Sequence, residues 1–425
     1  MKEKVNGIIN SLYPYLIAFL ALTVPLNYRY TLYVLGASIA FSIYMLVKDG
    51  GFKDIFKNRL ALGVVLLWLF YAFSLTYSSN LRYGLNDIFQ KISMVFLPLV
   101  LIPIARKPGN KSSLVKNSFL FGILVSSLFF IARAFVNSTL ITPVGIFFKP
   151  NPVGVPWENY FFYERFVSPH HPTYYSMYLA LGIVFIAEKI KHLSRLKVKV
   201  YFYLFWLYLL VVAYFTSSKV GIVLSIIISF LLLVWVLKRK GKIVISTFFA
   251  IFIVLGAFLI QNNYRLSFSI NNVAKYLNGS RVDDEIAKQG LVRFEIWRVF
   301  PKVFDDNSLL FGTGIGDVKK ELVAVYDKNN IKYARDVQLN AHNQYIQTLV
   351  SVGLIGLGIL LSILGYAFWL AYRKRDMVLF LFLIIISVNF MFESVLERVF
   401  GVIFFVFFLL FLSSKSEAKI ASIDS

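Results

Sequence analysis

The sequence predicts an all-α polytopic membrane protein with about twelve transmembrane helices. Of its 425 residues, 58% are hydrophobic. Runs of roughly 18 or more apolar residues recur along nearly the whole chain, and each is long enough to cross a hydrocarbon core of about 30 Å. These runs do not alternate in polarity, as membrane strands would. Basic residues, 44 Lys and Arg against 22 Asp and Glu, gather in alternate connections between the runs.

The predicted spans define four regions of the chain. Residues 1–260 hold nine spans and an outer loop at 138–171, residues 261–342 form a large loop, residues 343–413 hold three spans, and residues 414–425 form a short tail. The twelve spans are predicted at residues 10–27, 30–47, 60–78, 91–105, 117–137, 172–188, 200–217, 219–237, 243–260, 343–371, 377–393 and 399–413.

The distribution of Lys and Arg predicts the orientation in the membrane. With the N-terminus inside, 24 basic residues fall on inner segments and eight on outer positions. The other twelve lie in the 261–342 loop, which is too long to follow the positive-inside rule. Both termini are therefore expected in the cytoplasm. The same distribution accounts for much of the net charge of +22, so nucleic acid is not an expected partner. With no cysteine, disulfides, thiolate metal sites and cysteine nucleophiles are excluded.

The large loop at 261–342 is predicted to be partly helical. It contains twelve Lys or Arg and ten Asp or Glu. In the stretch LVRFEIWRVFPKVF (291–304), Phe294, Trp297, Phe300 and Phe304 recur at helical spacing, which indicates an ordered amphipathic helix. The following DNSLLFGTGIGD (306–317) is expected to be turn and loop. Its GTGIG lacks the spacing of a phosphate-binding loop.

His342 stands at the start of the predicted span at 343–371, in AHNQYIQ. The first backbone N–H groups of a helix are unpaired, and the helix dipole places partial positive charge there, so an anion such as phosphate is attracted. An imidazole at such a position is disfavoured as the cation and can accept a proton. Two interpretations stay open at this point: a polar helix cap, or a functional base.

Two basic residues are candidates for binding an anion. Arg293 shares a helix face with Trp297, and its fork of donors matches phosphate; the alternative is an ordinary solvated face. Lys219, in TSSKVGIVL, lies at the outer surface between two spans, where basic residues are scarce. A basic residue at membrane depth is a functional candidate. The alternative is a snorkelling lysine in a short turn.

His170 and His171 lie in SPHHPTYYSMY, at the outer end of the predicted span at 172–188. Adjacent histidines do not face the same way on a helix, and no HxxxH or carboxylate pattern completes a metal site. The pair therefore predicts hydrogen bonding at the membrane surface rather than a metal.

Together these motifs resemble the bacterial superfamily of O-antigen ligases and Wzy-type O-antigen polymerases. The resemblance rests on Arg293-x-x-x-Trp297, on HNQYIQ (342–347), on VGLIGL (352–357) and on SKVG (218–221), where Lys219 stands at a position that is often Arg in the superfamily.

The resemblance implies an inverting, metal-independent glycosyltransferase of the GT-C type in the bacterial inner membrane, with a large periplasmic loop and a periplasmic active face. Its donor would be a glycan on undecaprenyl pyrophosphate. The acceptor would be a lipid A–core sugar hydroxyl for a ligase, or another lipid-linked glycan for a polymerase. No cofactor is implied.

The resemblance also implies roles for particular residues. His342 would be the base, and Arg293 and Lys219 would hold the pyrophosphate. Candidate substrate-binding residues are His170, His171, Asn343, Gln347 and Trp297.

An alternative from another functional class is a polysaccharide transporter or flippase. Such a protein carries ionisable groups near the middle of the membrane and symmetric halves with interrupted helices. The predicted spans are almost free of internal charge, which argues against transport.

Overall fold

A computed structural model describes residues 2–48, 56–105, 112–154, 159–237, 250, 253–254, 256–258, 261–278, 285–304 and 308–421. The chain is largely helical and divides into two compact units. Unit 1 comprises Met1–Pro14, Leu32–Asn110 and Asn272–Ser425, and unit 2 comprises Tyr15–Thr31 and Lys111–Asn271. Three helices contribute residues to both units: α1 (Lys2–Thr23), α2 (Tyr28–Lys48) and α12 (Tyr264–Leu277).

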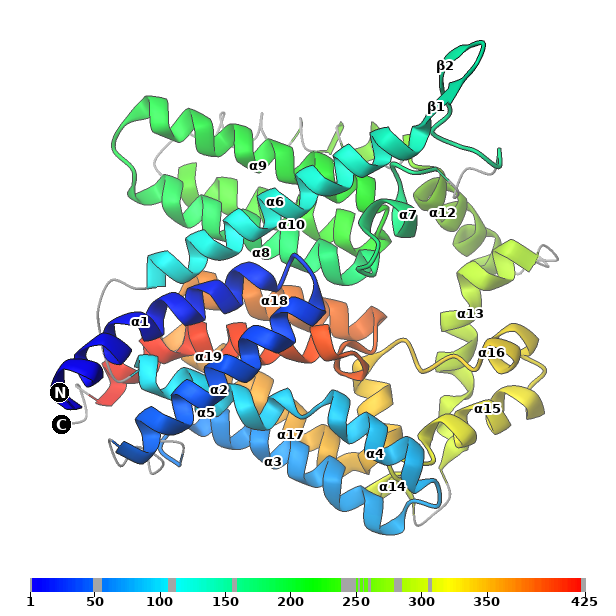
Figure 1. Cartoon of the computed structure of the whole chain (residues 1–425). Helices are drawn as coiled ribbons and strands as arrows, with labels where there is room; N and C mark the ends of the chain where they lie inside the picture. Colours follow the sequence, from blue (N-terminus) through cyan, green and yellow to red (C-terminus); the bar gives the residue numbers. More distant parts are fainter. Residues whose placement is uncertain are drawn as a thin grey trace. The chain divides into compact units, whose positions relative to one another are not determined.

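Unit 1 contains the first and last parts of the chain. Its long helix α17 packs against α3 and α18, and α19 packs against α5 (Figure 1). Apart from the shared helices, the elements of this unit are α3 (Arg59–Phe73), the 3₁₀ helix η2 (Ser74–Tyr77), α4 (Leu81–Gln90), α5 (Ser93–Ala105), α13 (Glu285–Val299), the 3₁₀ helix η4 (Phe300–Val303), α14 (Ser308–Phe311), α15 (Val318–Lys328), α16 (Lys332–Val337), α17 (Gln344–Lys374), α18 (Met377–Phe392), the 3₁₀ helix η5 (Val395–Glu397) and α19 (Val399–Ala421).

Unit 2 is built around α8, which is buried on nearly every side because α6, α9 and α10 pack around it. A helix that is apolar all round is expected in such a place. An antiparallel hairpin, β1 with β2, projects from the end of α6 (Figure 1). The elements are α6 (Ser112–Ser138), β1 (Thr139–Thr142), β2 (Gly145–Phe148), α7 (Tyr163–Val167), α8 (Pro172–His192), α9 (Leu196–Thr216) and α10 (Lys219–Leu237).

The helices confirm a polytopic all-α membrane protein. Among the described residues, seven helices are long and apolar enough to span a membrane: Tyr28–Lys48, Arg59–Tyr77, Leu81–Ile102, Ser112–Ser138, Leu196–Thr216, Lys219–Val236 and Gln344–Lys374. Shorter apolar helices occupy Ser11–Thr23, Met377–Phe392 and Val399–Ser414. The predicted span at 243–260 lies mostly outside the described residues. The total of twelve spans stays a prediction.

Helices α13, α15 and α16 enclose a small hydrophobic core of their own, which also contacts α17 through Val350. The buried face of α13 consists of Val292, Ile296 and Val299, and Trp297 packs beside it. The aromatic stripe expected from the sequence is therefore only partly right, because Phe294 remains 40% exposed. Within the expected turn segment 306–317, residues Ser308–Phe311 form the short helix α14.

Candidate active site

Trp297 contacts the residues that precede α17, and Arg293 lies beside it on α13. They lie one helical turn apart on α13, so they share a face. The indole Nε1 of Trp297 donates to the carbonyl oxygen of Ala341 at 3.0 Å. From the other side, the amide of Ala341 donates to Oε1 of Gln347 at 3.1 Å. Both polar groups of this fully buried peptide segment are thus fixed, and the next residue is His342.

The backbone of His342 lies in the left-handed region, with φ of +46°. Its amide donates to Oδ1 of Asn340 at 3.0 Å. The cap of α17 is the next residue, Asn343, whose Oδ1 accepts from the amide of Ile346 at 3.1 Å. The interpretation of His342 as the helix cap is therefore wrong. Its imidazole is left for other contacts, with 22% of the side chain exposed.

Glu393, which was not predicted as a site residue, contacts two residues that were, Arg293 and His342. It follows the last turn of α18, where its amide donates to the carbonyl of Asn389 at 2.9 Å. Its Oε1 lies 3.4 Å from Nδ1 of His342, and its Oε2 lies 3.4 Å from Nη2 of Arg293. Glu393 is only 8% exposed, so little water screens these charges. The structure thereby brings Arg293, Glu393 and His342 into one cluster.

His342 and Glu393 lie within ion-pair distance of each other, but no hydrogen bond joins them. Nδ1 of His342 is buried and makes no hydrogen bond among the described residues, so the 3.4 Å approach counts as an ion-pair distance only. Hydrogen bonds of catalytic groups are often long without substrate and shorten when it binds. A shift of about 0.5 Å would give an ordinary hydrogen bond. In that arrangement Nδ1 donates to the carboxylate, and Nε2 is left to accept a proton.

The short connection that carries Glu393 is fixed at two further points. The amide of Leu396 donates to Oε1 of Gln344 in the first turn of α17, at 2.7 Å. Glu397 accepts from the Nζ of Lys91 at 2.8 Å, and the same ammonium group also contacts Asp87 at 2.6 Å. Lys91 is completely buried. This connection is therefore held by a buried ion cluster as well as by α17.

The position of Lys91 contradicts two predictions, one about where this residue lies and one about the absence of charge within the spans. It was expected at the outer end of a span that begins at residue 91. The apolar helical segment instead runs from Leu81 to Ile102, so Lys91 lies inside it. The spans are consequently less free of internal charge than the sequence indicated. Because Lys91 is paired with two carboxylates, its burial is compensated in the way that buried charges require.

The glycine loop 312–316 supports a break in α17. The helix is interrupted at Val352 and Gly353, where Gly353 has φ of +68°. The interruption frees carbonyl groups of the preceding turn. The amide of Thr313 donates to the carbonyl of Val350 at 2.8 Å, and that of Gly314 donates to the carbonyl of Ser351 at 3.1 Å. The predicted turn role of GTGIG agrees with these contacts, since its amides are used to satisfy protein groups.

Lys219 belongs to unit 2, where its neighbours in SKVG have clear local roles. The hydroxyl of Ser218 accepts from the amide of Gly221 at 3.2 Å, which caps the start of α10. A side chain at Gly221 would run into Ser176 of α8, so glycine permits the two helices to approach closely. Lys219 itself is the first residue of α10 and is partly buried.

His170 and His171 also lie in unit 2. Nε2 of His170 lies 3.1 Å from the carbonyl oxygen of Leu26, and the ring packs among aromatic side chains, including Tyr175. Burial lowers the pKa of His170, although the hydrogen bond to Leu26 opposes the shift. His171 caps α8 by accepting from the amide of Thr173 at 3.4 Å. A substrate contact by either histidine stays a prediction.

Comparison with known proteins supplies the family. Residues 203–361 match the family model described as O-antigen ligase. The match covers less than half of the chain. It confirms the predicted resemblance, and it supports a ligase- or polymerase-type function for this multi-pass membrane protein. A search of curated proteins gives no match.

The O-antigen ligase match ends before Glu393 and includes six of the predicted residues: Lys219, Arg293, Trp297, His342, Asn343 and Gln347. One sequence signal could have found Glu393. It is an acidic residue in a short connection between two strongly apolar spans, and ionisable residues in such positions are functional candidates by default.

Proposed function

We propose that this O-antigen ligase-like protein transfers a glycan from undecaprenyl pyrophosphate to a sugar hydroxyl of lipid A–core, at the periplasmic face of the bacterial inner membrane. The observation that carries the proposal is the cluster of His342, Glu393 and Arg293 in a chain whose residues 203–361 match the O-antigen ligase family model. A base, a carboxylate and a guanidinium group side by side are the groups that this transfer requires.

His342 is the proposed base. The acceptor hydroxyl loses its proton to Nε2 of His342, and its oxygen forms a bond to the anomeric carbon. The bond from that carbon to the pyrophosphate oxygen breaks, and the electron pair leaves with undecaprenyl pyrophosphate. Attack opposite the leaving group inverts the configuration of the carbon. The carboxylate of Glu393, 3.4 Å from Nδ1, stabilises the imidazolium that forms.

Arg293 and Lys219 are the proposed partners of the pyrophosphate. Negative charge grows on the leaving group as its bond breaks, and fixed cations lower the energy of that state. Arg293 uses one nitrogen for Glu393, and 33% of its side chain is exposed. Among the described residues, no three His, Asp or Glu side chains cluster closely enough to hold a metal ion. Independence from metal is part of the proposal.

The remaining predicted residues of unit 1 are proposed to act around this centre. Trp297 and Gln347 form hydrogen bonds with the backbone of Ala341, directly before His342, and Asn343 caps the helix that follows. Their hydrogen bonds support a positioning role, with substrate contact made by the exposed parts of the side chains. His170 and His171 are proposed to bind substrate at the end of α8.

A polymerase that joins lipid-linked repeats remains the alternative, because both activities use the same donor and differ in the acceptor. The polysaccharide profile of a strain that lacks the protein separates them. A ligase predicts free lipid A–core together with accumulated lipid-linked polymer. Core that carries a single repeat identifies a polymerase instead. Complementation with the wild-type chain, but not with His342→Ala, ties the profile to this site.

The transporter is the lower alternative. The features that favour it are the break in α17, which the glycine loop 312–316 stabilises, and the buried Lys91. Its two carboxylate partners account for that lysine as a structural ion cluster. An assay with purified protein in vesicles distinguishes a transporter from a glycosyltransferase. Movement of labelled lipid across the bilayer without formation of a glycosidic bond would replace the glycosyltransferase by a transporter.

A further inference from the structure

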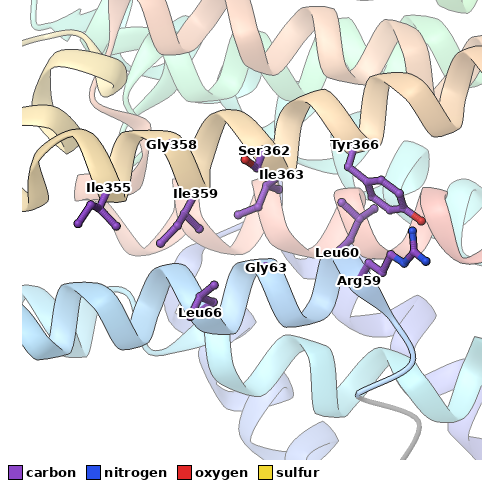
Figure 2. A pocket seen from close by; sticks show the side chains of 10 residues that line it. All are labelled: Arg59, Leu60, Gly63, Leu66, Ile355, Gly358, Ile359, Ser362, Ile363 and Tyr366. Carbon is purple, nitrogen blue, oxygen red and sulfur yellow. The ribbon is translucent and has the colours of Figure 1, made fainter.

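A groove of about 440 Å³ runs between α3 and the part of α17 that follows its break (Figure 2). This volume lies within the range of small-molecule sites. The groove is separate from the His342 cluster, since its nearest lining residue on α17 is Ile355, beyond the break. Its lining consists of Arg59, Leu60, Gly63, Leu66, Ile355, Gly358, Ile359, Ser362, Ile363 and Tyr366.

Missing side chains create the groove. A Cβ atom placed on Gly358 would meet no atom within 4 Å, so this glycine leaves open space along the wall. Across from it, Gly63 allows α3 to approach Ile363, whose Cγ1 would lie 2.9 Å from a Cβ atom at that position. Leu60 and Ile363 are buried and form the floor. The result is a narrow, apolar channel.

One end of the groove is basic and aromatic. The guanidinium group of Arg59 lies over the ring of Tyr366, 5.8 Å from its centre, and both side chains stand at the same end in Figure 2. Further along α17, Arg373 lies over the ring of Trp369. Tyr, Trp and Arg are typical of the interface between membrane and water. None of the ten lining residues is acidic, so the charge at this end is positive.

The length of the groove matches one leaflet. Ile355 and Tyr366 are separated by eleven residues, which is about 16 Å along a helix. Half of a hydrocarbon core of about 30 Å is about 15 Å. Gln344 lies at the beginning of the predicted span 343–371, and Tyr366 lies near its other end. The basic end therefore belongs to the leaflet opposite the His342 cluster.

We propose that this groove binds an anionic phospholipid of that opposite leaflet. One acyl chain occupies the channel past Gly358, and the phosphate contacts Arg59. The occupant is a bilayer phospholipid and not the proposed glycan donor, because the donor pyrophosphate would sit at the other membrane face. The site does not depend on the proposed reaction. The bound lipid would lie between α3 and the part of α17 that follows its break.

Photocrosslinking tests the proposal. Full-length protein is placed in bilayers that contain phosphatidylglycerol with a photoreactive group in the acyl chain, and labelled peptides are identified by mass spectrometry. The filling variant is Gly358→Leu. The matched control is Gly365→Leu on the same helix, where a Cβ atom also meets nothing within 4 Å but the residue does not line the groove. A third variant, Arg59→Gln, removes the charge and leaves the channel open.

The expected result is labelling within 355–366 that falls several-fold in Gly358→Leu and is unchanged in Gly365→Leu. Arg59→Gln should lower the preference for phosphatidylglycerol over phosphatidylcholine by about fivefold, the effect of one basic residue at an anionic surface. Equal labelling in wild type and Gly358→Leu overturns the proposal, as does an unchanged headgroup preference in Arg59→Gln. Preferential labelling of the groove by a photoreactive polyprenyl phosphate overturns the choice of occupant.

Discussion

Replacing Glu393 by Gln keeps the shape of the side chain and removes its negative charge. In the proposed reaction that charge faces the imidazolium of His342 at 3.4 Å. Two unit charges at this distance attract by about 1.2 kcal/mol at the dielectric constant of water and about 5 kcal/mol at an effective value of 20. The cluster is partly exposed, so the true figure lies between these limits. At about 1.4 kcal/mol per factor of ten, Glu393→Gln should slow transfer about 10- to 1,000-fold.

The assay is transfer of glycan from a purified lipid-linked donor to a lipid acceptor by protein in liposomes, with kcat and KM measured separately. The loss should appear mainly in kcat, because the imidazolium exists only during transfer. Glu393→Asp keeps the charge and should recover part of the rate. Glu295→Gln, which alters a carboxylate paired with Arg298 on the same helix as Arg293, is the control. A wild-type kcat in well-folded Glu393→Gln would refute the role of the carboxylate.

Three further predictions concern folding, measured as unfolding in detergent. Lys91→Met leaves two buried carboxylates without their cation and should cost about 3–5 kcal/mol, partly restored by adding Glu397→Gln. Burial lowers the pKa of His170, so below about pH 6.5 the unfolded chain binds a proton that the folded chain does not. The stability of the wild type should therefore fall below this pH, and that of His170→Gln should not. Gly353→Ala should cost more than about 1 kcal/mol, because φ is +68° and the new Cβ meets the backbone of Leu310 and Phe311 in α14.

Each of these three predictions would be contradicted by a specific result. Unchanged stability of Lys91→Met would mean that the ion cluster is dispensable. A pH profile of His170→Gln that equals the wild-type profile would assign the acid sensitivity to another group. Gly365→Ala is the control for the last variant, since its Cβ meets nothing within 4 Å. Equal stability of Gly353→Ala and Gly365→Ala would remove the strain argument.

The sequence predicted those parts of the site that depend on spacing along one helix. The interval between Arg293 and Trp297 predicted a shared face. Trp297 contacts Ala341, and Arg293 contacts Glu393, which lies near His342. The apolar runs predicted most helices because a span needs about 20 such residues, and this requirement leaves a clear pattern. HNQYIQ marked the start of α17, although the cap proved to be Asn343.

Other features depend on contacts between distant segments, which spacing cannot predict. Glu393 meets His342 only because α18 ends beside the start of α17. Lys91 was misplaced because an apolar window cannot distinguish a buried, paired lysine from one at the end of a span. The break at Gly353 was missed because VGLIGL fits a continuous helix equally well. The break is stabilised by hydrogen bonds from the glycine loop 312–316, which is distant in the sequence.

The most direct test of the central claim is the rate of a single turnover with His342→Ala in liposomes that contain a lipid-linked glycan donor and lipid A–core. His192→Ala, which alters an exposed histidine in the last turn of α8, is the control for general effects of losing an imidazole. The proposed mechanism predicts that transfer is nearly abolished in His342→Ala and unchanged in His192→Ala. Transfer by His342→Ala at the wild-type rate would contradict it.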